Sequence, residues 1–349
     1  LAVKRVLLGM SGGVDSAAAA VFLRRQGYEV EGATLLLEGN ADGAGDAARA
    51  AAVLGIPHRT VELRETFRRE VMDVFAAEYR AGRTPNPCVL CNRAVKFGAM
   101  LRYALDNGFD AVATGHYARI REENGRFLLE AVPSKKDQSY MLYALSQEQL
   151  AHIVFPIGSL EKEQVREVAR EAGLPVASKP DSQDICFVPD GDYAAFLARY
   201  ANEPFTPGDF VDAAGNVLGR HQGLARYTVG QRKGLGSFGK PMYVTALDAA
   251  RNRVVLGEEG SQYRAELTVS GVNWIPFDAP AGPIRCRAKI RYHAPAAPCE
   301  VTPLPGGRAA VRFDEPQRSV TPGQSAVFYD GALVLGGGLI DSDTKEDTP

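Results

Sequence analysis

The order of apolar and polar positions divides the chain into an alternating first part and a β-rich second part. Over residues 1–114, short apolar runs alternate with amphipathic stretches, which predicts a parallel sheet with helices on both faces. The predicted strands are Val3–Gly9, Glu29–Leu37, Arg59–Leu63 and Ala111–Thr114. The predicted helices are Val14–Gln26, Asp46–Leu54, Thr66–Ala81 with Thr66 as its cap, and Val95–Asn107.

After about residue 204 the sequence pattern changes from alternating strands and helices to short β-rich runs. Before that point we expect a hairpin at Asn124-Gly125 and two helices, Leu160–Ala172 and Asp192–Tyr200. Beyond it, glycine and proline separate short β-rich runs: Phe210-Val211, Met242–Leu247, Arg253–Leu256, Glu266–Val272, Arg285–Tyr292, Ala309–Phe313 and Ser325–Tyr329. The predicted fold class is α/β. A doubly wound domain spans 1–204, a small central β domain 205–266, and a barrel-like β domain with a solvated tail 267–349.

Composition narrows the function classes. The 349 residues are 45% hydrophobic and 23% charged, which is typical of a globular chain of two or three domains. No run reaches the roughly 18 apolar residues of a membrane span, and the first residues lack a signal peptide's apolar region. Five scattered cysteines do not suit a disulfide framework, so we expect a cytoplasmic protein with no membrane contact. A net charge of −2 argues against bulk nucleic-acid binding but leaves room for a local basic patch.

A glycine-rich turn joins the first predicted strand to the first predicted helix. Glycines allow close approach of backbone N–H groups, and the helix N-terminus favours negative charge, so the turn is suited to an anion. Asp15 is a candidate for holding Mg²⁺ on bound phosphates. The turn lacks the lysine of a Walker loop and the spacing of G-x-G-x-x-G. A plain tight turn is the alternative. The residues concerned are Gly9, Met10, Ser11, Gly12, Gly13, Val14, Asp15 and Ser16.

Three cysteines are the second candidate for chemistry. Cys88 and Cys91 form a Cys-x-x-Cys pair on a proline-fixed loop entering a helix, and Cys186 lies far downstream. A cysteine near a helix N-terminus is a candidate for a lowered thiol pKa, as nucleophiles and metal ligands require. Inert packing is the alternative for any one of them.

Six segments in order resemble the tRNA-specific 2-thiouridylase family (MnmA). They are Gly9–Ser16, Thr84–Asn92, Ala113–Arg119, Lys136–Tyr140, Ser182–Phe187 and Gly230–Gly236. The first also resembles the pyrophosphatase loop of ATP-cleaving adenylating enzymes. The resemblance implies an ATP-dependent tRNA sulfurtransferase. Such an enzyme adenylates the carbon-2 oxygen of the wobble uridine and replaces it with sulfur, releasing AMP and pyrophosphate.

The resemblance also implies roles for individual residues. Cys91 matches the nucleophile, and Cys186 matches the cysteine that bears the incoming sulfur as a persulfide. ATP contacts fall on Gly9–Ser16, Leu35 and Gly115, with Mg²⁺ on the phosphates. The tRNA contacts fall on Asn86, Pro87, Cys88, Lys136, Asp137, Gln138, Arg291 and Tyr292. A cysteine desulfurase, a relay protein or sulfide is the implied sulfur donor.

Position 88 departs from the family, in which many members carry Asp there. A Cys-x-x-Cys plus one distant Cys is similar to the three-ligand pattern of a [4Fe-4S] cluster in related tRNA thiolases. We favour a cluster held by Cys88, Cys91 and Cys186, because a third cysteine otherwise has no role. The alternative is a Cys186 persulfide resolved by Cys91, with Cys88 a bystander.

Further residues give weaker signals. Arg285, Arg287, Lys289 and Arg291 recur at period two, which puts four cations on one strand face and favours phosphate contact. The alternating Cys286 is expected to point into a core. For His116 two interpretations stay open: contact with a ligand, or a position in the core. Two other functions stay open: an adenylating ligase acting on a metabolite, and a non-catalytic metal-binding RNA-recognition protein.

Overall fold

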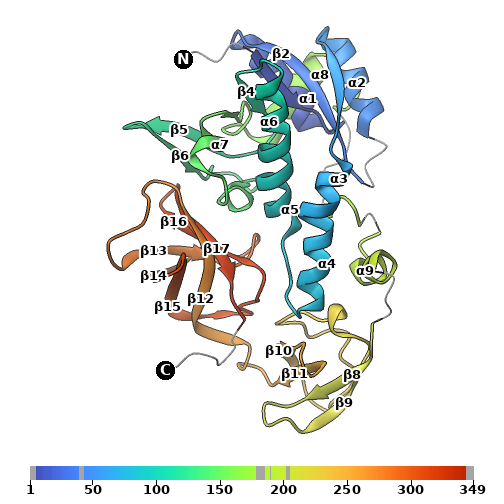
Figure 1. The fold of residues 1–349 in the computed structure, drawn as a ribbon, viewed down its shortest axis with the longest axis vertical. Helices are drawn as coiled ribbons and strands as arrows, with labels where there is room; N and C mark the ends of the chain where they lie inside the picture. Colours follow the sequence, from blue (N-terminus) through green and yellow to red (C-terminus); the bar gives the residue numbers. More distant parts are fainter. Residues whose placement is uncertain (1–4, 39–42, 178–184, 189, 202–204, 343–349) are drawn as a thin grey trace. The chain divides into compact units, whose positions relative to one another are not determined.

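The structure is a computed structural model that describes residues 5–38, 43–177, 185–188, 190–201 and 205–342 (Figure 1). The chain forms two compact units. The first comprises Leu1–Met72, Pro87–Gly191 and Gly331–Val334, and the second comprises Asp73–Asn86, Asp192–Asp330 and Leu335–Pro349.

A five-stranded parallel sheet forms the centre of the first unit, with strand order β3-β2-β1-β4-β7. Its strands are β1 (Arg5–Gly9), β2 (Glu29–Leu36), β3 (His58–Glu62), β4 (Ala111–Ala113) and β7 (Ile153–Val154). Residue Val6 pairs with Val30 on one side and with Ala111 on the other. The order reverses direction between β1 and β4, which makes this the topological switch point of the sheet.

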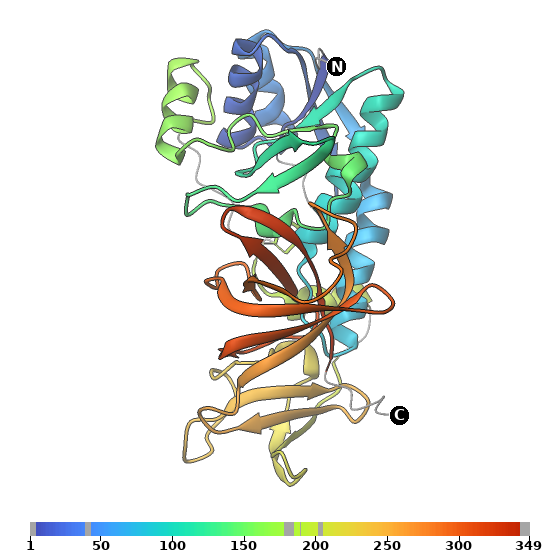
Figure 2. The same ribbon diagram turned by 90° about the vertical axis from the view of Figure 1, so that its left-hand side faces the viewer.

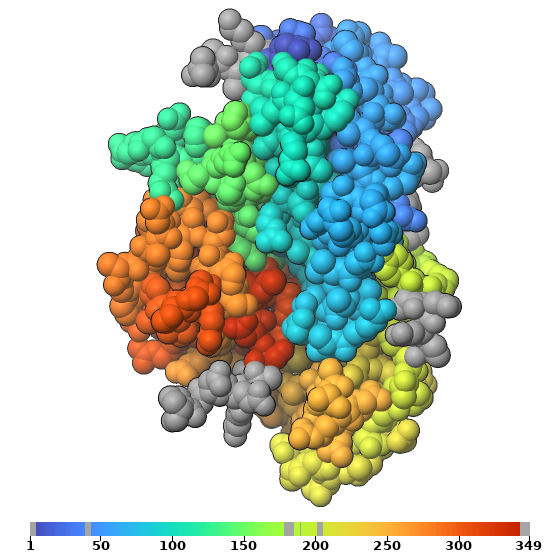
Figure 3. Space-filling view, in the orientation of Figure 1, coloured from blue at the N-terminus to red at the C-terminus, as the bar shows by residue number. Residues whose placement is uncertain are grey.

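Helices cover both faces of this sheet, as the alternating sequence predicts. The helices α1 (Val14–Arg25), α2 (Gly43–Leu54) and α8 (Lys162–Glu171) share one apolar core with Val6 and Leu8. Because α1 presents a run of alanines to this core, α8 packs closely beside it, as both views show (Figure 2). The helix α6 (Met100–Asp106) packs against β4 and forms part of the surface drawn in Figure 3. The predicted doubly wound fold is confirmed.

Besides α2, which starts at Gly43 rather than Asp46, two helices begin earlier than predicted. The first starts at Arg64, running through α3 (Arg64–Phe67), a π-helical turn (Arg68–Met72) and α4 (Asp73–Arg80). Thr66 is therefore not its cap; the Glu62 carboxylate accepts a hydrogen bond from the Arg64 N–H at 3.1 Å instead. The second starts at Pro87 rather than Val95, because proline suits the first position of a helix. It comprises α5 (Pro87–Leu90), a π-helical stretch (Cys91–Ala99) and α6.

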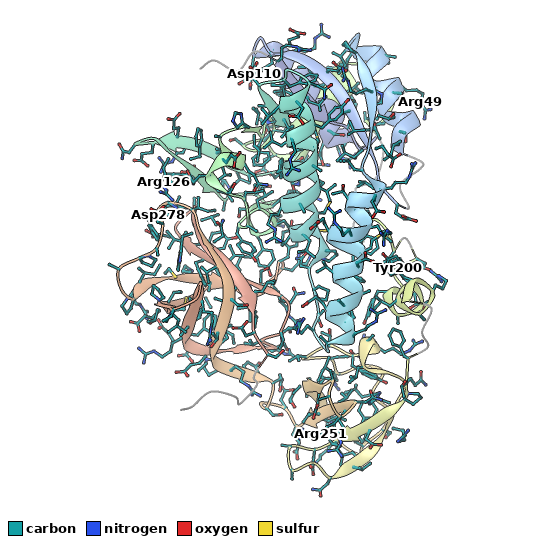
Figure 4. The ribbon with its side chains drawn as sticks, in the orientation of Figure 1. Arg49, Asp110, Arg126, Tyr200, Arg251 and Asp278 are labelled. Atoms are coloured by element: carbon teal, nitrogen blue, oxygen red, sulfur yellow. The ribbon has the colours of Figure 1, made fainter. Side chains whose placement is uncertain are left out.

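The remaining elements of the first unit are short. Strands β5 (Arg119–Glu123) and β6 (Arg126–Glu130) form the predicted hairpin, and Figure 4 labels Arg126 at the start of β6. Its turn residues Asn124 and Gly125 have φ of 52° and 74°, as a type I′ turn requires. A 3-10 turn (Ser139–Met141) and α7 (Gln147–Leu150) complete the unit. Leu333, from the segment Gly331–Val334, pairs with Glu130.

The second unit carries two β modules, which confirms the predicted all-β second part. A four-stranded sheet has the order β10-β11-β8-β9. A second sheet closes on itself because β12 pairs with both β15 and β17. Figure 2 shows this barrel in orange to red. The strands are β8 (Gly208–Val211), β9 (Val217–His221), β10 (Tyr243–Asp248), β11 (Arg253–Gly257), β12 (Tyr263–Trp274), β13 (Ile284–Lys289), β14 (Ala297–Leu304), β15 (Arg308–Arg318), β16 (Ser325–Asp330) and β17 (Leu333–Ile340).

Short helical elements complete the second unit. Helix α9 (Tyr193–Ala201) packs on α4, where the Tyr200 hydroxyl, labelled in Figure 4, donates to the Asp73 carboxylate at 2.6 Å. A 3-10 turn spans Leu224–Arg226. Of the described helices, none is both long and apolar enough to cross a membrane. The predicted boundaries near residues 204 and 266 stay predictions.

Candidate active site

The loop after β1 is held in shape by its own serines and glycines. The Ser16 hydroxyl donates to the Gly13 carbonyl at 3.1 Å and accepts from the Ser11 N–H at 3.2 Å. Gly12 has a φ of +75°, and a Cβ there would lie 2.5 Å from the Gly43 carbonyl oxygen. Any other residue at position 12 would therefore displace the loop.

The loop leads directly into the N-terminus of α1. Gly13 is the N-cap residue, and no side chain in the described part of the chain caps this helix. The first-turn N–H groups of a helix lack intrahelical acceptors, and the helix dipole adds positive potential there. The end of α1 is therefore suited to bind an anion such as a phosphate.

Asp15, in the first turn of α1, is bound by two residues that sequence reasoning missed. The Lys162 ammonium at the start of α8 lies 2.7 and 2.8 Å from the two carboxylate oxygens of Asp15. The Tyr117 hydroxyl donates to Asp15 Oδ1 at 2.8 Å. The Lys162 side chain is only 10% exposed. A buried ammonium against the carboxylate disfavours a second cation, so Asp15 does not fit the predicted role of magnesium ligand.

Gly115 brings the loop after β4 against the loop after β1. A Cβ at Gly115 would lie 2.8 Å from the Asp15 carbonyl carbon and 2.9 Å from the Ser16 nitrogen. The two loops follow neighbouring strands at the switch point, where open α/β sheets bind ligands. Leu35 lies near the carboxyl end of β2, at the same sheet edge. The structure therefore brings together the residues predicted to contact ATP.

Three cysteines lie near one another in the first unit. Cys88 is an exposed residue of α5, Cys91 is buried and opens the π-helical stretch, and Cys186 is exposed. Cys88 acts electrostatically on the thiols of Cys91 and Cys186, and Cys186 acts on the thiol of Cys91. The helix that carries Cys88 and Cys91 also reaches the end of β1, because a Cβ at Gly9 would lie 3.3 Å from Met100 Cε. Ser182, Gln183 and Asp184 lie outside the described residues.

The prediction of a lowered thiol pKa is wrong. Although part of the Cys88 residue is exposed and it sits near the start of a helix, the protein around its sulfur excludes water and raises the pKa of the thiol above its usual range. Burial, with smaller effects of Cys186 and Cys88, raises the pKa of Cys91 to about 12. Desolvation and Cys88 also raise the pKa of Cys186. Removal of water outweighs the helix dipole at these positions, and the resting thiols are protonated at neutral pH.

Lys96 is a third residue that sequence reasoning missed. It lies in the π-helical stretch, and its charge lowers the pKa of Cys88, Cys91 and Cys186, opposing the effect of burial. Burial and the same charge hold the pKa of His116 well below its usual range. The neutral His116 ring shares a 2.7 Å hydrogen bond with Thr114 Oγ1 and packs on Phe97. His116 is therefore part of the core beside the site. No sequence signal distinguished Lys96 or Lys162 from surface lysines.

The residues predicted to contact tRNA are distributed over both units. Pro87 is buried and Asn86 is half-buried. In the loop after β6, the Asp137 carboxylate accepts from the Val132 N–H at 3.1 Å and from the Ser139 hydroxyl at 2.9 Å. Gln138 exchanges hydrogen bonds with the backbone of Tyr117. Asp137 and Gln138 thus shape the loops around the Asp15 site.

The C-terminal cations do not form one uniform exposed face. Arg285 makes two hydrogen bonds to the Asp314 carboxylate, at 2.9 and 2.7 Å. Arg291 is half-buried and donates to the Val229 carbonyl at 2.9 Å and to Thr321. The Lys289 ammonium lies 5.7 Å from the centre of the Tyr292 ring. Arg287 is exposed.

The cysteines do not form a ready metal site. Within the described ranges, no three or more His, Cys, Asp or Glu side chains are grouped so that they could hold a metal ion. In the described structure the three cysteine side chains are thus not arranged as a preformed metal site.

Known proteins resemble this chain over nearly its whole length. Residues 4–190 match the tRNA methyl transferase HUP domain, 194–258 the tRNA methyl transferase PRC-barrel domain, and 264–340 the aminomethyltransferase beta-barrel domain. A tRNA-specific 2-thiouridylase MnmA of Acetivibrio thermocellus is 51% identical over 97% of this chain and 99% of its own. The chain belongs to the MnmA family. MnmA proteins of Desulfitobacterium hafniense and Nostoc sp. are 48% and 49% identical over 97% and 98% of this chain, and 98% and 100% of theirs.

The thiol pKa values in this MnmA-family chain predict how Cys91 reacts with pH. A pKa of about 12 leaves Cys91 protonated at pH 7, so its alkylation by iodoacetamide rises roughly tenfold per pH unit from pH 7 to 10. Replacing Lys96 with Met removes a charge that lowers this pKa, and the rate falls further. Peptide mass spectrometry after timed labelling measures both. A plateau below pH 9 would contradict the prediction, and Arg93→Met serves as the charge-matched control on the same helix.

Proposed function

We propose that this chain is an ATP-dependent tRNA 2-thiouridylase. It adenylates the carbon-2 oxygen of the wobble uridine and replaces that oxygen with sulfur, releasing AMP and pyrophosphate. One observation carries the proposal: an anion-ready loop at the switch point lies in the same unit as three cysteines, in a chain 51% identical to a curated 2-thiouridylase. The relatives give no support to a metabolite ligase or a non-catalytic RNA binder.

The adenylation step depends on residues of the loops after β1 and β4. In our proposal the N–H groups at the start of α1 hold the ATP phosphates, and Leu35 and Gly115 contact the nucleotide. Lys162 and Tyr117 fix Asp15 and therefore the first turn of α1. Mg²⁺ supplies charge neutralisation on the phosphates when ATP is bound. Adenylation of the carbon-2 oxygen of the uridine lets that oxygen depart as part of AMP, which is a far better leaving group.

The sulfur step uses the cysteine trio. We propose that Cys186 carries the sulfur as a persulfide, whose outer sulfur attacks carbon 2 and expels AMP. The Cys91 thiolate then attacks the Cys186 sulfur, which leaves the thiocarbonyl on the base and a Cys91–Cys186 disulfide that a dithiol reduces. Lys96 supports the anionic forms, because its charge lowers the pKa of both thiols. In this scheme Cys88 lies beside the base, with Asn86 and Pro87.

The alternative sulfur scheme is a [4Fe-4S] cluster on Cys88, Cys91 and Cys186. The electrostatic proximity of the three thiols favours it, and the absence of a metal-ready group in the described ranges weighs against it. We therefore rank the persulfide scheme first. In the persulfide scheme the sulfur donor is a cysteine desulfurase or a relay protein, which delivers sulfur already at the persulfide level, whereas sulfide is a donor only in the cluster scheme. We place the protein in the cytoplasm, where thiols such as its five free cysteines stay reduced.

We expect the overall reaction in a defined mixture. Unmodified tRNA, incubated anaerobically with the protein, ATP, Mg²⁺, a dithiol, and a cysteine desulfurase with cysteine as the source of persulfide sulfur, yields 2-thiouridine and AMP, detected by mass spectrometry of nucleosides. Asp15→Asn leaves Lys162 without its carboxylate and lowers AMP formation about 100-fold. Glu163→Gln removes a neighbouring exposed charge and leaves the rate unchanged. AMP formation at the normal rate in Asp15→Asn would refute the role of this ion pair.

The cysteine variants separate the two sulfur schemes. Cys186→Ser and Cys91→Ser abolish 2-thiouridine but keep AMP formation, because adenylation does not use a thiol. Cys88→Ser retains thiolation in the persulfide scheme and loses it in the cluster scheme. Anaerobic iron and acid-labile sulfide assays give the second readout. About four irons per active chain, together with inactive Cys88→Ser, would overturn the persulfide scheme.

The proposed tRNA contacts predict that tRNA affinity depends on salt through a local group of exposed cations. Arg287→Ala removes one exposed cation from β13 and lowers the slope of log affinity against log salt by about 1. The matched control is Arg220→Ala, which removes an exposed arginine of β9 that pairs with Asp209. We expect it to leave the salt slope unchanged. Filter binding at several salt concentrations measures both. Equal slopes for Arg287→Ala and the parent chain would remove Arg287 from the interface.

A further inference from the structure

The barrel contains a second pair of cysteines that the proposed reaction does not use. Cys286 on β13 and Cys299 on β14 are direct partners in the antiparallel register. Their sulfur atoms lie 3.7 Å apart, and both are free thiols. Cys286 points inward as the alternating sequence predicts, although it is only half-buried.

The backbone already suits a bond between these sulfurs. Opposed residues of antiparallel strands have Cα atoms about 4.5 to 5.5 Å apart, inside the roughly 4.4 to 6.8 Å range of disulfides. The sulfurs must approach to about 2.05 Å, which side-chain rotation accommodates. Cys299 has no exposed surface, whereas Cys286 does, so a small oxidant reaches the pair through Cys286.

Neighbouring charges adjust the reactivity of the pair. The hydrogen bond between the thiols lowers the pKa of Cys299 and raises that of Cys286. Arg285 favours the thiolate form of both cysteines, while Asp314 opposes it at Cys299 and Asp330 at Cys286. The 3.7 Å contact places each sulfur where it can attack the other once one of them is oxidised.

We propose that Cys286 and Cys299 form a reversible disulfide when the protein meets a peroxide. One thiol takes an oxygen atom from hydrogen peroxide, becomes a sulfenic acid and releases water. The second thiol attacks that sulfur, the S–S bond forms, and a second water leaves. Two thiols and one hydrogen peroxide thus give one disulfide and two waters. A dithiol reverses the reaction by exchange.

The disulfide would close a ring across the β13–β14 connection. The two cysteines are 13 positions apart, and the ring contains Arg291 and Tyr292. Oxidation therefore restrains the segment that carries two predicted tRNA contacts. The inference goes beyond the proposed function, and its test involves neither tRNA nor ATP, so failure of one leaves the other standing.

The test is a disulfide map of the full chain. The reduced protein is treated with hydrogen peroxide, its remaining thiols are blocked with iodoacetamide, and it is digested with trypsin without reduction. Cleavage after Arg285, Arg287, Arg291 and Arg308 yields the dipeptide Cys286-Arg287 linked to peptide 292–308. Dithiothreitol restores the two separate peptides. Amide hydrogen exchange within 287–298 slows at least severalfold in the oxidised protein.

Two variants control for the other cysteines. Cys186→Ser forms the same linked peptides, because the barrel pair is independent of the trio. Cys286→Ser forms none and shows no change in exchange after peroxide. Recovery of both barrel cysteines as free thiols while the trio is oxidised would overturn the proposal. Linkage of Cys286 to a different cysteine, or unchanged exchange in the oxidised protein, would do the same.

Discussion

The contact between Lys162 and Asp15 is the interaction that holds together the elements around the glycine-rich loop of the first unit. It joins the start of α8 to the first turn of α1, and Tyr117 ties the loop after β4 to the same carboxylate. Burying an ammonium costs several kcal/mol unless a charge partner compensates it. The buried Lys162 ammonium is therefore stable only beside the Asp15 carboxylate. Because Asp15 directly follows the glycine-rich loop, this contact also fixes the position of the loop. Close contact at Gly115 leaves no space for an alternative arrangement.

The three cysteines Cys88, Cys91 and Cys186 differ from the Lys162–Asp15 pair, because their buried groups are neutral and not charged. Their thiols are kept protonated by desolvation rather than activated, since burial raises the pKa of Cys91 to about 12. A protonated thiol resists oxidation and adventitious alkylation. The Lys96 charge partly offsets this protection at all three cysteines. Such a centre reacts when a substrate brings an electrophile next to it, which suits a reaction that creates its electrophile by adenylation.

Sequence reasoning succeeded where a signal is local. Periodicity gave the parallel sheet, and Asn124-Gly125 gave the hairpin. It failed where tertiary contacts decide. Strand β14 contains Pro298 and Pro303, and β17 contains consecutive glycines, so neither reads as a strand. The thiol pKa was wrong because burial is not visible in a motif, and Lys162 was missed because its partner Asp15 is 147 positions away. The roles proposed for Cys91 and Cys186 come from the resemblance and stay predictions, because spacing alone leaves them open.

The π-helical stretch Cys91–Ala99 sets which side chains share a face. In an α-helix, residues five apart point about 140° away from each other, because each residue turns by about 100°. The i→i+5 hydrogen bonds of a π-helix bring residues five apart close to the same side. Cys91 and Lys96 are five apart. Loss of one residue that converted this stretch to an α-helix would rotate the lysine away from the thiols while leaving the helix intact. The π-helical winding of the backbone thus determines whether the Lys96 charge lies on the same side of the helix as the Cys91 thiol.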